Sequence, residues 1–150
     1  YFQMIKTFRG IMAHNTEQKI RLSTKKGKIG YMIHKFQIMS NSPTTASAES
    51  TIMIWKISQD SVEYKVNFSD GNLLGVAVWS TNATAEANPE DSTVIFDREV
   101  FNQDIFLTHY NTTGSETCNY YLELETINMT DNAATVSTLR DIRLNPQLHG

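Results

Sequence analysis

The sequence is short of cysteine, proline and charge: its 150 residues include 1 Cys and 3 Pro, and only 19% are charged. A single cysteine excludes an intrachain disulfide framework, and the modest charge excludes an acidic or basic disordered tail. No apolar run approaches the roughly 18 residues that a membrane-spanning helix requires. These absences leave a folded chain whose length suits one domain.

Uncharged polar residues dominate what is present. Ser, Thr and Asn occupy 41 positions, while 40% of the residues are apolar. This balance favours a β-rich fold with loops lined by hydroxyl and amide groups. The first three residues, Tyr1, Phe2 and Gln3, resemble the end of an engineered protease-recognition tag, so we expect a single domain over residues 4–150.

Segments with strand character recur about every ten residues, with turn signals between them. They cover residues 18–38, 51–57, 61–69, 73–79, 93–96, 104–110, 118–127 and 134–144, the last of which would also suit a short helix. This spacing predicts an all-β fold, a single antiparallel two-sheet β-sandwich with a jelly roll as the leading topology.

Several of these segments also predict how the chain turns and which side chains share a face. Residues 18–38 read as a β-hairpin turning at 25–28, with Met32, His34, Phe36 and Ile38 on one face of its second arm and Tyr31, Ile33, Lys35 and Gln37 on the other. Residues 51–57 are apolar on both faces, as in a central strand. Gly75 marks a bulge or a close backbone approach. In 118–127, Tyr120, Leu122 and Leu124 share one face, opposite Tyr121, Glu123 and Glu125.

Charge is distributed unevenly along the chain. Residues 1–40 carry a net +7, and the remaining residues carry a net −10. Such asymmetry indicates a nucleic-acid surface, or oppositely charged faces that meet within the fold or between subunits. The basic residues Lys25, Lys26 and Lys28 have no interleaved exposed aromatics, which argues against a specific nucleic-acid site and favours a solvated or partner-facing turn.

No local catalytic motif occurs, so we assign no catalytic, cofactor-binding or metal-binding residue and expect a protein that is not an enzyme. The four histidines, His14, His34, His109 and His149, lack metal-ligand spacing. Cys118 could pair with His109 as a nucleophile, but its neighbours supply no cation, which favours an inert, partly buried thiol. A set of acidic residues could hold calcium, although solvated carboxylates are the simpler interpretation: Glu86, Glu90, Asp91, Asp97, Glu99 and Asp104.

Several stretches of the chain together resemble known proteins. They are residues 19–22, 27–31, 35–38, 54–56, 66–70, 95–105 and 119–125. In their order and composition they resemble small structural proteins of marine tailed bacteriophages, including cyanophages, over about residues 6–143. The resemblance implies a virion protein, such as one that decorates the capsid, with no active-site residues to transfer.

The leading functional expectation is therefore a non-enzymatic virion protein that folds in the host cytoplasm and binds the major capsid protein, or itself as an oligomer such as a trimer. The alternative is an adhesin-like tail or fibre module that binds host glycans. Its candidate contacts are the aromatic residues Trp79, Tyr110 and Tyr121, each of which also suits a core position. A third interpretation is a sandwich hydrolase whose catalytic residues lie far apart in sequence.

Overall fold

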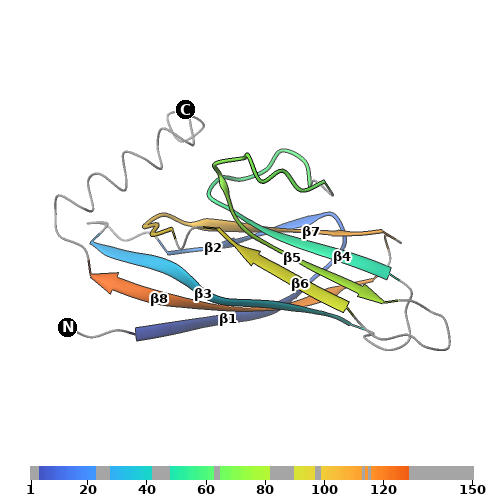
Figure 1. Cartoon of the computed structure of the whole chain (residues 1–150), viewed down its shortest axis with the longest axis horizontal. Coiled ribbons are helices and arrows are strands. Elements are labelled where there is room, and N and C mark those ends of the chain that lie inside the picture. The colour runs from blue at the N-terminus through green and yellow to red at the C-terminus, as the bar shows by residue number, and fades with distance from the viewer. Residues whose placement is uncertain are drawn as a thin grey trace.

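Eight strands form two antiparallel sheets in the computed structural model, which describes residues 4–22, 28–41, 48–62, 65–81, 90–96, 99–112, 114 and 116–128 (Figure 1). The strands are β1 (Met4–Met12), β2 (Thr16–Ile20), β3 (Ile29–Ser40), β4 (Ala48–Trp55), β5 (Leu73–Thr81), β6 (Glu90–Ile95), β7 (Ile105–Asn111) and β8 (Cys118–Asn128). Sheet A has the order β1-β8-β3, and sheet B has the order β2-β7-β4-β5-β6. The predicted two-sheet β-sandwich is confirmed.

The strand pairs are nested: strands from the two ends of the described chain pair with each other, and so do successive strands towards its middle. β1 pairs with β8, β2 with β7, and β4 with β5, all antiparallel. Between the second and third of these pairs, Tyr31 of β3 forms an isolated bridge with Phe101, which precedes β7. This order is that of a jelly roll. β6 adds a fifth strand at the β5 edge of sheet B.

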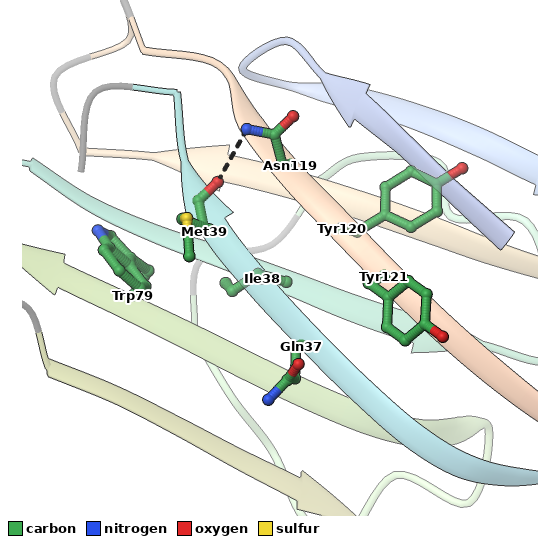
Figure 2. Close-up of a pocket in the computed structure, with 7 residues that line it drawn as sticks. All are labelled: Gln37, Ile38, Met39, Trp79, Asn119, Tyr120 and Tyr121. Atoms are coloured by element: carbon green, nitrogen blue, oxygen red, sulfur yellow. Dashed lines mark hydrogen bonds between the residues drawn. The ribbon is translucent and has the colours of Figure 1, made fainter. Parts of the chain in front are cut away.

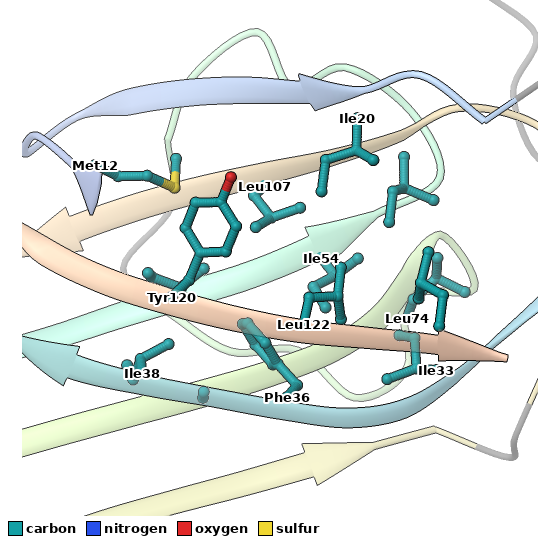
Figure 3. Packing of buried hydrophobic residues seen from close by; sticks show 14 of the residues in the cluster. Met12, Ile20, Ile33, Phe36, Ile38, Ile54, Leu74, Leu107, Tyr120 and Leu122 are labelled. Carbon is teal, nitrogen blue, oxygen red and sulfur yellow. The ribbon is translucent and has the colours of Figure 1, made fainter. Parts of the chain in front are cut away.

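The core lies between the two sheets, where alternate side chains of facing strands meet (Figure 3). Sheet A contributes Phe36, Ile38, Tyr120 and Leu122 among others, and sheet B contributes Ile54, Leu74 and Leu107. A second, smaller cluster lies on the outer face of sheet B: Met53, Trp55, Leu73 and Val76, with Val78, Val94, Phe96 and Phe106 packed against them. Apolar residues on both faces explain why β4, β5 and β7 occupy the middle of sheet B.

The predicted hairpin over residues 18–38 is wrong. β2 pairs with β7 in sheet B, whereas β3 pairs with β8 in sheet A, so the chain crosses from one sheet to the other between them. Residues 23–27, including most of the expected turn, lie outside the described residues. A glycine-containing turn signals that the chain reverses, but which strand each arm then pairs with depends on partners more than 80 residues away.

The predicted faces of β3 are confirmed from residue 35 onward and are wrong before it. Tyr31 and Ile33 point inward, and beyond them Phe36 and Ile38 do so, while His34 is exposed. The cause is a register shift against β8 between Ile33 and Lys35. One extra residue at this β-bulge reverses the alternation for the rest of the strand.

Other expectations are confirmed. β4 is the middle strand of sheet B, and Leu122 and Leu124 of β8 are fully buried. Gly75 lies at a register shift between β4 and β5, and a Cβ there would come within 3.3 Å of the Val94 carbonyl oxygen.

The described residues of 61–69 form no strand, and residues 134–144 lie outside the described part of the chain. β1 was not anticipated, because its side chains are mostly exposed and lack an alternating pattern.

Part of the charge asymmetry is neutralised within the fold. Lys19 of the basic segment lies 3.3 Å from the carboxylate of Asp104, which also accepts a hydrogen bond from the Leu22 backbone. His34 lies 4.0 Å from Glu123. The basic N-terminal strands and the acidic later strands therefore meet at these positions.

Candidate functional site

The outer face of sheet A carries two shallow depressions on either side of β8, and Figure 2 shows the one beside β3. Both are lined by Asn119, Tyr120 and Tyr121. The first, of about 200 Å³, extends to the 37–39 segment of β3 and to Trp79. The second, of about 450 Å³, extends to the 9–11 segment of β1. Because Ile11 and Met39 both pair with Asn119, one row of side chains crosses the whole sheet here.

Amide, phenol and carboxylate groups on this face are held in place by hydrogen bonds. The Asn119 side-chain amide donates to the Met39 carbonyl over 3.3 Å. The Tyr121 hydroxyl donates to a Glu123 carboxylate oxygen over 2.7 Å, and this bond raises the pKa of Tyr121. The face therefore presents polar groups of fixed orientation beside two exposed apolar side chains, Ile11 and Met39.

The structure brings Trp79 and Tyr121 to one depression, but it does not leave Trp79 as an exposed platform. Trp79 points from β5 into the core, and only 7% of it is exposed. Its indole Nε1 is buried and has no hydrogen-bond partner among the described residues. Trp79 thus serves mainly as a core residue whose edge reaches the depression beside β3 (Figure 2).

Tyr110 lies apart from the other two aromatic candidates. It belongs to β7 of sheet B, and its ring packs edge-to-face against His14 at a centroid distance of 4.7 Å. His14 also accepts a hydrogen bond from the Asn111 backbone through Nδ1. The three aromatics proposed for glycan binding therefore do not form one surface.

Cys118 and His109 are both fully buried. Burial raises the pKa of the Cys118 thiol to about 11, despite a hydrogen bond with Ser50. The same effect lowers the pKa of His109, whose Nδ1–H donates to the Ala13 carbonyl over 3.0 Å. At neutral pH the thiol keeps its proton, so this pair lacks the thiolate that a cysteine nucleophile requires.

Of the six acidic residues considered as calcium ligands, the two whose side chains are described each pair with a lysine. Glu99 pairs with Lys56, and Asp104 pairs with Lys19. Glu86 and Asp97 lie outside the described residues, as do the side chains of Glu90 and Asp91. Across the described ranges, no three His, Cys, Asp or Glu side chains gather closely enough to hold a metal ion. Lys25 and Lys26 also lie outside the described residues, whereas Lys28 is described and exposed.

A further apolar depression on sheet B was not anticipated. Its volume is about 280 Å³, and it is lined by Val66, Phe68, Val76, Val78, Ser92 and Val94. Phe68 is 61% exposed and packs edge-to-face on Phe96. The weak alternation of residues 61–69 was interpreted as a strand, although Val66 and Phe68 in fact belong to a loop that lies against the outer cluster of sheet B.

Comparisons with known proteins supply no family. No protein-family model and no curated protein matches the chain. Among solved structures, a Bacillus endospore appendage, from a family of disulfide-linked pili, is 9% identical with a TM-score of 0.35, covering 87% of this chain and 93% of that one. A mitogen from Yersinia pseudotuberculosis is 16% identical with a TM-score of 0.31, covering 87% and 89%.

A third similar structure is a capsular polysaccharide depolymerase, the tailspike protein of an Acinetobacter baumannii bacteriophage. It is 8% identical with a TM-score of 0.19, and the match covers 77% of this chain but 20% of the tailspike. Similarities at this level say nothing about function.

Within the described residues, no helix is long and apolar enough to cross a membrane.

Proposed function

We propose that the chain is a non-enzymatic structural protein of a bacteriophage virion, which decorates or stabilises the capsid by docking on the major capsid protein. The observation that carries this proposal is the concentration of exposed apolar side chains on sheet A. Among the described residues, six large apolar side chains are exposed, and four of them lie on its two outer strands: Met4, Ile5, Ile11 and Met39. Exposed apolar groups among polar ones are typical of surfaces that bind another protein.

The row through Asn119 is the centre of this docking surface. Ile11 and Met39 flank Asn119 at 53% and 52% exposure, and the two depressions lie beside it. A capsid loop that fills either depression would bury an apolar side chain and gain hydrogen bonds from fixed amides. Folding in the host cytoplasm is consistent with a thiol that is buried in the core.

The test is co-sedimentation of the purified protein with capsids of the phage that encodes it. We expect saturable binding, which Met39→Lys weakens about tenfold because it places a charge in the interface. Lys65→Met is the control, since this exposed residue lies on the loop beside sheet B. Absence of saturable binding, or a source other than a phage genome, would contradict the proposal.

A glycan-binding tail or fibre module is the second candidate. The observation that favours it is the grouping of Gln37, Asn119 and Tyr121 around one depression, since sugars are bound by amides beside an aromatic ring. On a glycan array, Tyr121→Ala would abolish binding, while Tyr110→Ala on the other sheet would leave it unchanged. Binding that survives Tyr121→Ala excludes this site.

A further inference from the structure

Among the described residues, none covers the outer edge of β1 by strand pairing. β8 occupies one side of β1, and no described segment pairs with the other side. The backbone pattern shows which groups face this edge. Tyr31 exchanges backbone hydrogen bonds with Phe101, so its partner on β8, Thr126, turns its own backbone groups towards Met4. Even-numbered residues of β1 therefore bond to β8, and the odd-numbered residues Ile5, Thr7, Arg9 and Ile11 present free N–H and C=O groups.

Two of the four outward side chains along this edge are exposed apolar residues. Ile5 is 43% exposed and Ile11 is 53% exposed, both on the outer face of sheet A. Such edges are normally blocked by proline or by inward-pointing charge. β1 has no proline. Its inward Lys6 is a charge of this kind, but its ammonium lies over the Tyr31 ring of the same chain, 5.7 Å from the centroid, so a second strand can pair here where a small residue stands opposite Lys6.

The sequence of β1 complements itself when it is reversed. If two copies pair antiparallel with Phe8 opposite Phe8, then Ile5 faces Ile11, Thr7 faces Arg9, and Lys6 faces Gly10, which has no side chain. All four edge residues of each copy then form hydrogen-bonded pairs, giving about eight backbone hydrogen bonds. Apolar residues meet apolar ones, and no two like charges stand directly opposite.

The neighbouring registers are worse. Moving the partner by two residues in one direction places Arg9 opposite Arg9, and moving it in the other places Ile5 opposite Arg9. Each shift also loses about two backbone hydrogen bonds. A shift by one residue would put inward side chains of one copy beside outward ones of the other.

Charge supports the symmetric register as well. Thr7 pairs with Glu123 of β8, so the Arg9 of a second copy, opposite Thr7, lies two strands from this carboxylate. Two strand spacings are about 9.6 Å, a distance that the two long side chains can span across the small Thr7. Each interface would contain this Arg–Glu contact twice because of the two-fold axis.

We propose that a second copy of this chain binds along β1 in this register, joining the two copies of sheet A into one continuous sheet around a two-fold axis. This inference concerns the protein in solution and does not rest on the virion role. The interface is a strand pairing with modest buried area, so the dimer dissociates on dilution.

The first test uses two variants matched by position. Ile11→Lys and Met39→Lys each place a lysine beside Asn119, but only Ile11 lies at the β1 edge. Sedimentation equilibrium over about 1–500 µM protein should show a monomer–dimer equilibrium for the wild type. Ile11→Lys should raise the dissociation constant about tenfold or more, and Met39→Lys should change it less than about twofold.

The second test fixes the register by disulfide trapping. In the double variant Ile5→Cys/Ile11→Cys, each new thiol faces its counterpart on the second copy at a Cα separation of about 5.5 Å, which suits a disulfide. We expect mild oxidation to yield a covalent dimer from the double variant and none from Ile5→Cys alone. Buried Cys118 gives no competing crosslink while the protein is folded.

Three results would overturn the proposal. They are a monomer throughout the concentration range, a dimer that Met39→Lys disrupts as strongly as Ile11→Lys, and a covalent dimer formed as readily by Ile5→Cys alone. Because Met39→Lys is also the variant expected to weaken capsid docking, loss of docking with an intact dimer, or the converse, separates this inference from the proposed function.

Discussion

His109 lies fully buried on β7, where its Nδ1–H donates to the Ala13 carbonyl and its Nε2 has no hydrogen-bond partner among the described residues. Desolvation is the main reason that its pKa falls below the ordinary value of 6.5, and the neighbouring His14 adds a smaller repulsion. A second proton on this ring would leave a charge in the core without an acceptor at Nε2. The neutral tautomer with hydrogen on Nδ1 is therefore the one that the fold stabilises.

This burial predicts a loss of stability in mild acid. Because the folded pKa of His109 lies below the unfolded value, the unfolded chain takes up the proton first as the pH falls. The free energy of unfolding should decrease below about pH 6.5, by at most about 1.4 kcal/mol per pH unit from this group, until the folded pKa is reached.

Urea unfolding between about pH 8 and pH 5 tests this prediction. His109→Asn keeps a side-chain donor near the Ala13 carbonyl but cannot titrate, so its stability should depend less on pH, although the lost volume lowers it overall. An unchanged pH slope in His109→Asn would show that another group is responsible.

Lys56 is a charged residue held in the interior. Its side chain is almost completely buried, and its ammonium group forms an ion pair with Glu99. Glu99→Gln should lower the free energy of unfolding by about 3 kcal/mol, because it leaves the buried ammonium without its carboxylate. The double variant Lys56→Met/Glu99→Gln should recover much of this loss.

The exposed pair Lys19–Asp104 provides the control for this effect. Lys19→Met should change stability by less than about 1 kcal/mol, because half of its side chain is already solvated. Chemical denaturation of all three variants gives the comparison. A Glu99→Gln variant as stable as the wild type would mean that water or another group solvates Lys56.

At the scale of elements, the close approach of β6 to β5 depends on Gly75, which has no side chain. A Cβ on Gly75 would lie 3.3 Å from the Val94 carbonyl oxygen on β6 and 3.8 Å from the Ile54 side chain. Gly75→Ala should therefore displace β6 and reduce stability by about 1–2 kcal/mol. Hydrogen exchange should report faster opening of β6 amides than of β8 amides in the variant, and equal protection of both strands would contradict this explanation.

Local patterns predicted some elements well, because burial of a strand leaves a periodic trace in its sequence. The apolar run in 51–57 and the alternation in 118–127 correspond to β4 and β8. β1 left no such trace, since it lies at an edge with most side chains in solvent. The faces of β3 before residue 35 were mispredicted because the bulge at His34 is set by pairing with β8, which local periodicity does not report.

The candidate site was less predictable than the fold. An aromatic side chain has the same signal in a sequence whether it is exposed or in the core, so Trp79 and Tyr110 were selected together with Tyr121. Asn119, Gln37 and Met39 became candidates only when pairing of β3 with β8 placed them around one depression. Strand pairing determines such sites, and it is a non-local property.

At the scale of the whole molecule, the uneven charge predicts how assembly responds to salt. Lys19 already meets an acidic partner within the chain. The β1 edge relies mainly on backbone and apolar groups, and its two Arg9–Glu123 contacts, made by a solvent-exposed arginine, contribute little. At about 1 M salt, where screening acts within about 3 Å, the β1 dimer should weaken less than about threefold. Capsid docking should weaken markedly more only where the basic N-terminal strands contact acidic groups of the capsid, in addition to the apolar row through Asn119.

Light-scattering mass after size-exclusion chromatography, at low and high salt, measures the assembly state. Co-sedimentation with capsids at the same salt concentrations measures docking. A dimer mass at both salt concentrations agrees with pairing along β1. A closed trimer, which the resemblance to virion proteins suggests, would instead require an interface other than a two-fold strand pairing. Docking that is indifferent to salt would remove charge complementarity from the explanation.

The nested pairing of strands also determines how the molecule would respond to mechanical force. Met4 at the start of β1 pairs with Thr126 near the end of β8, so the first and the last of the described strands meet at these two ends. Tension applied between residues 4 and 128 would load the β1–β8 ladder one rung at a time, from that end inward. The sandwich should peel open at low force along this direction, whereas pulling from Met12 and Asn128 would strain all the rungs at once and meet much greater resistance.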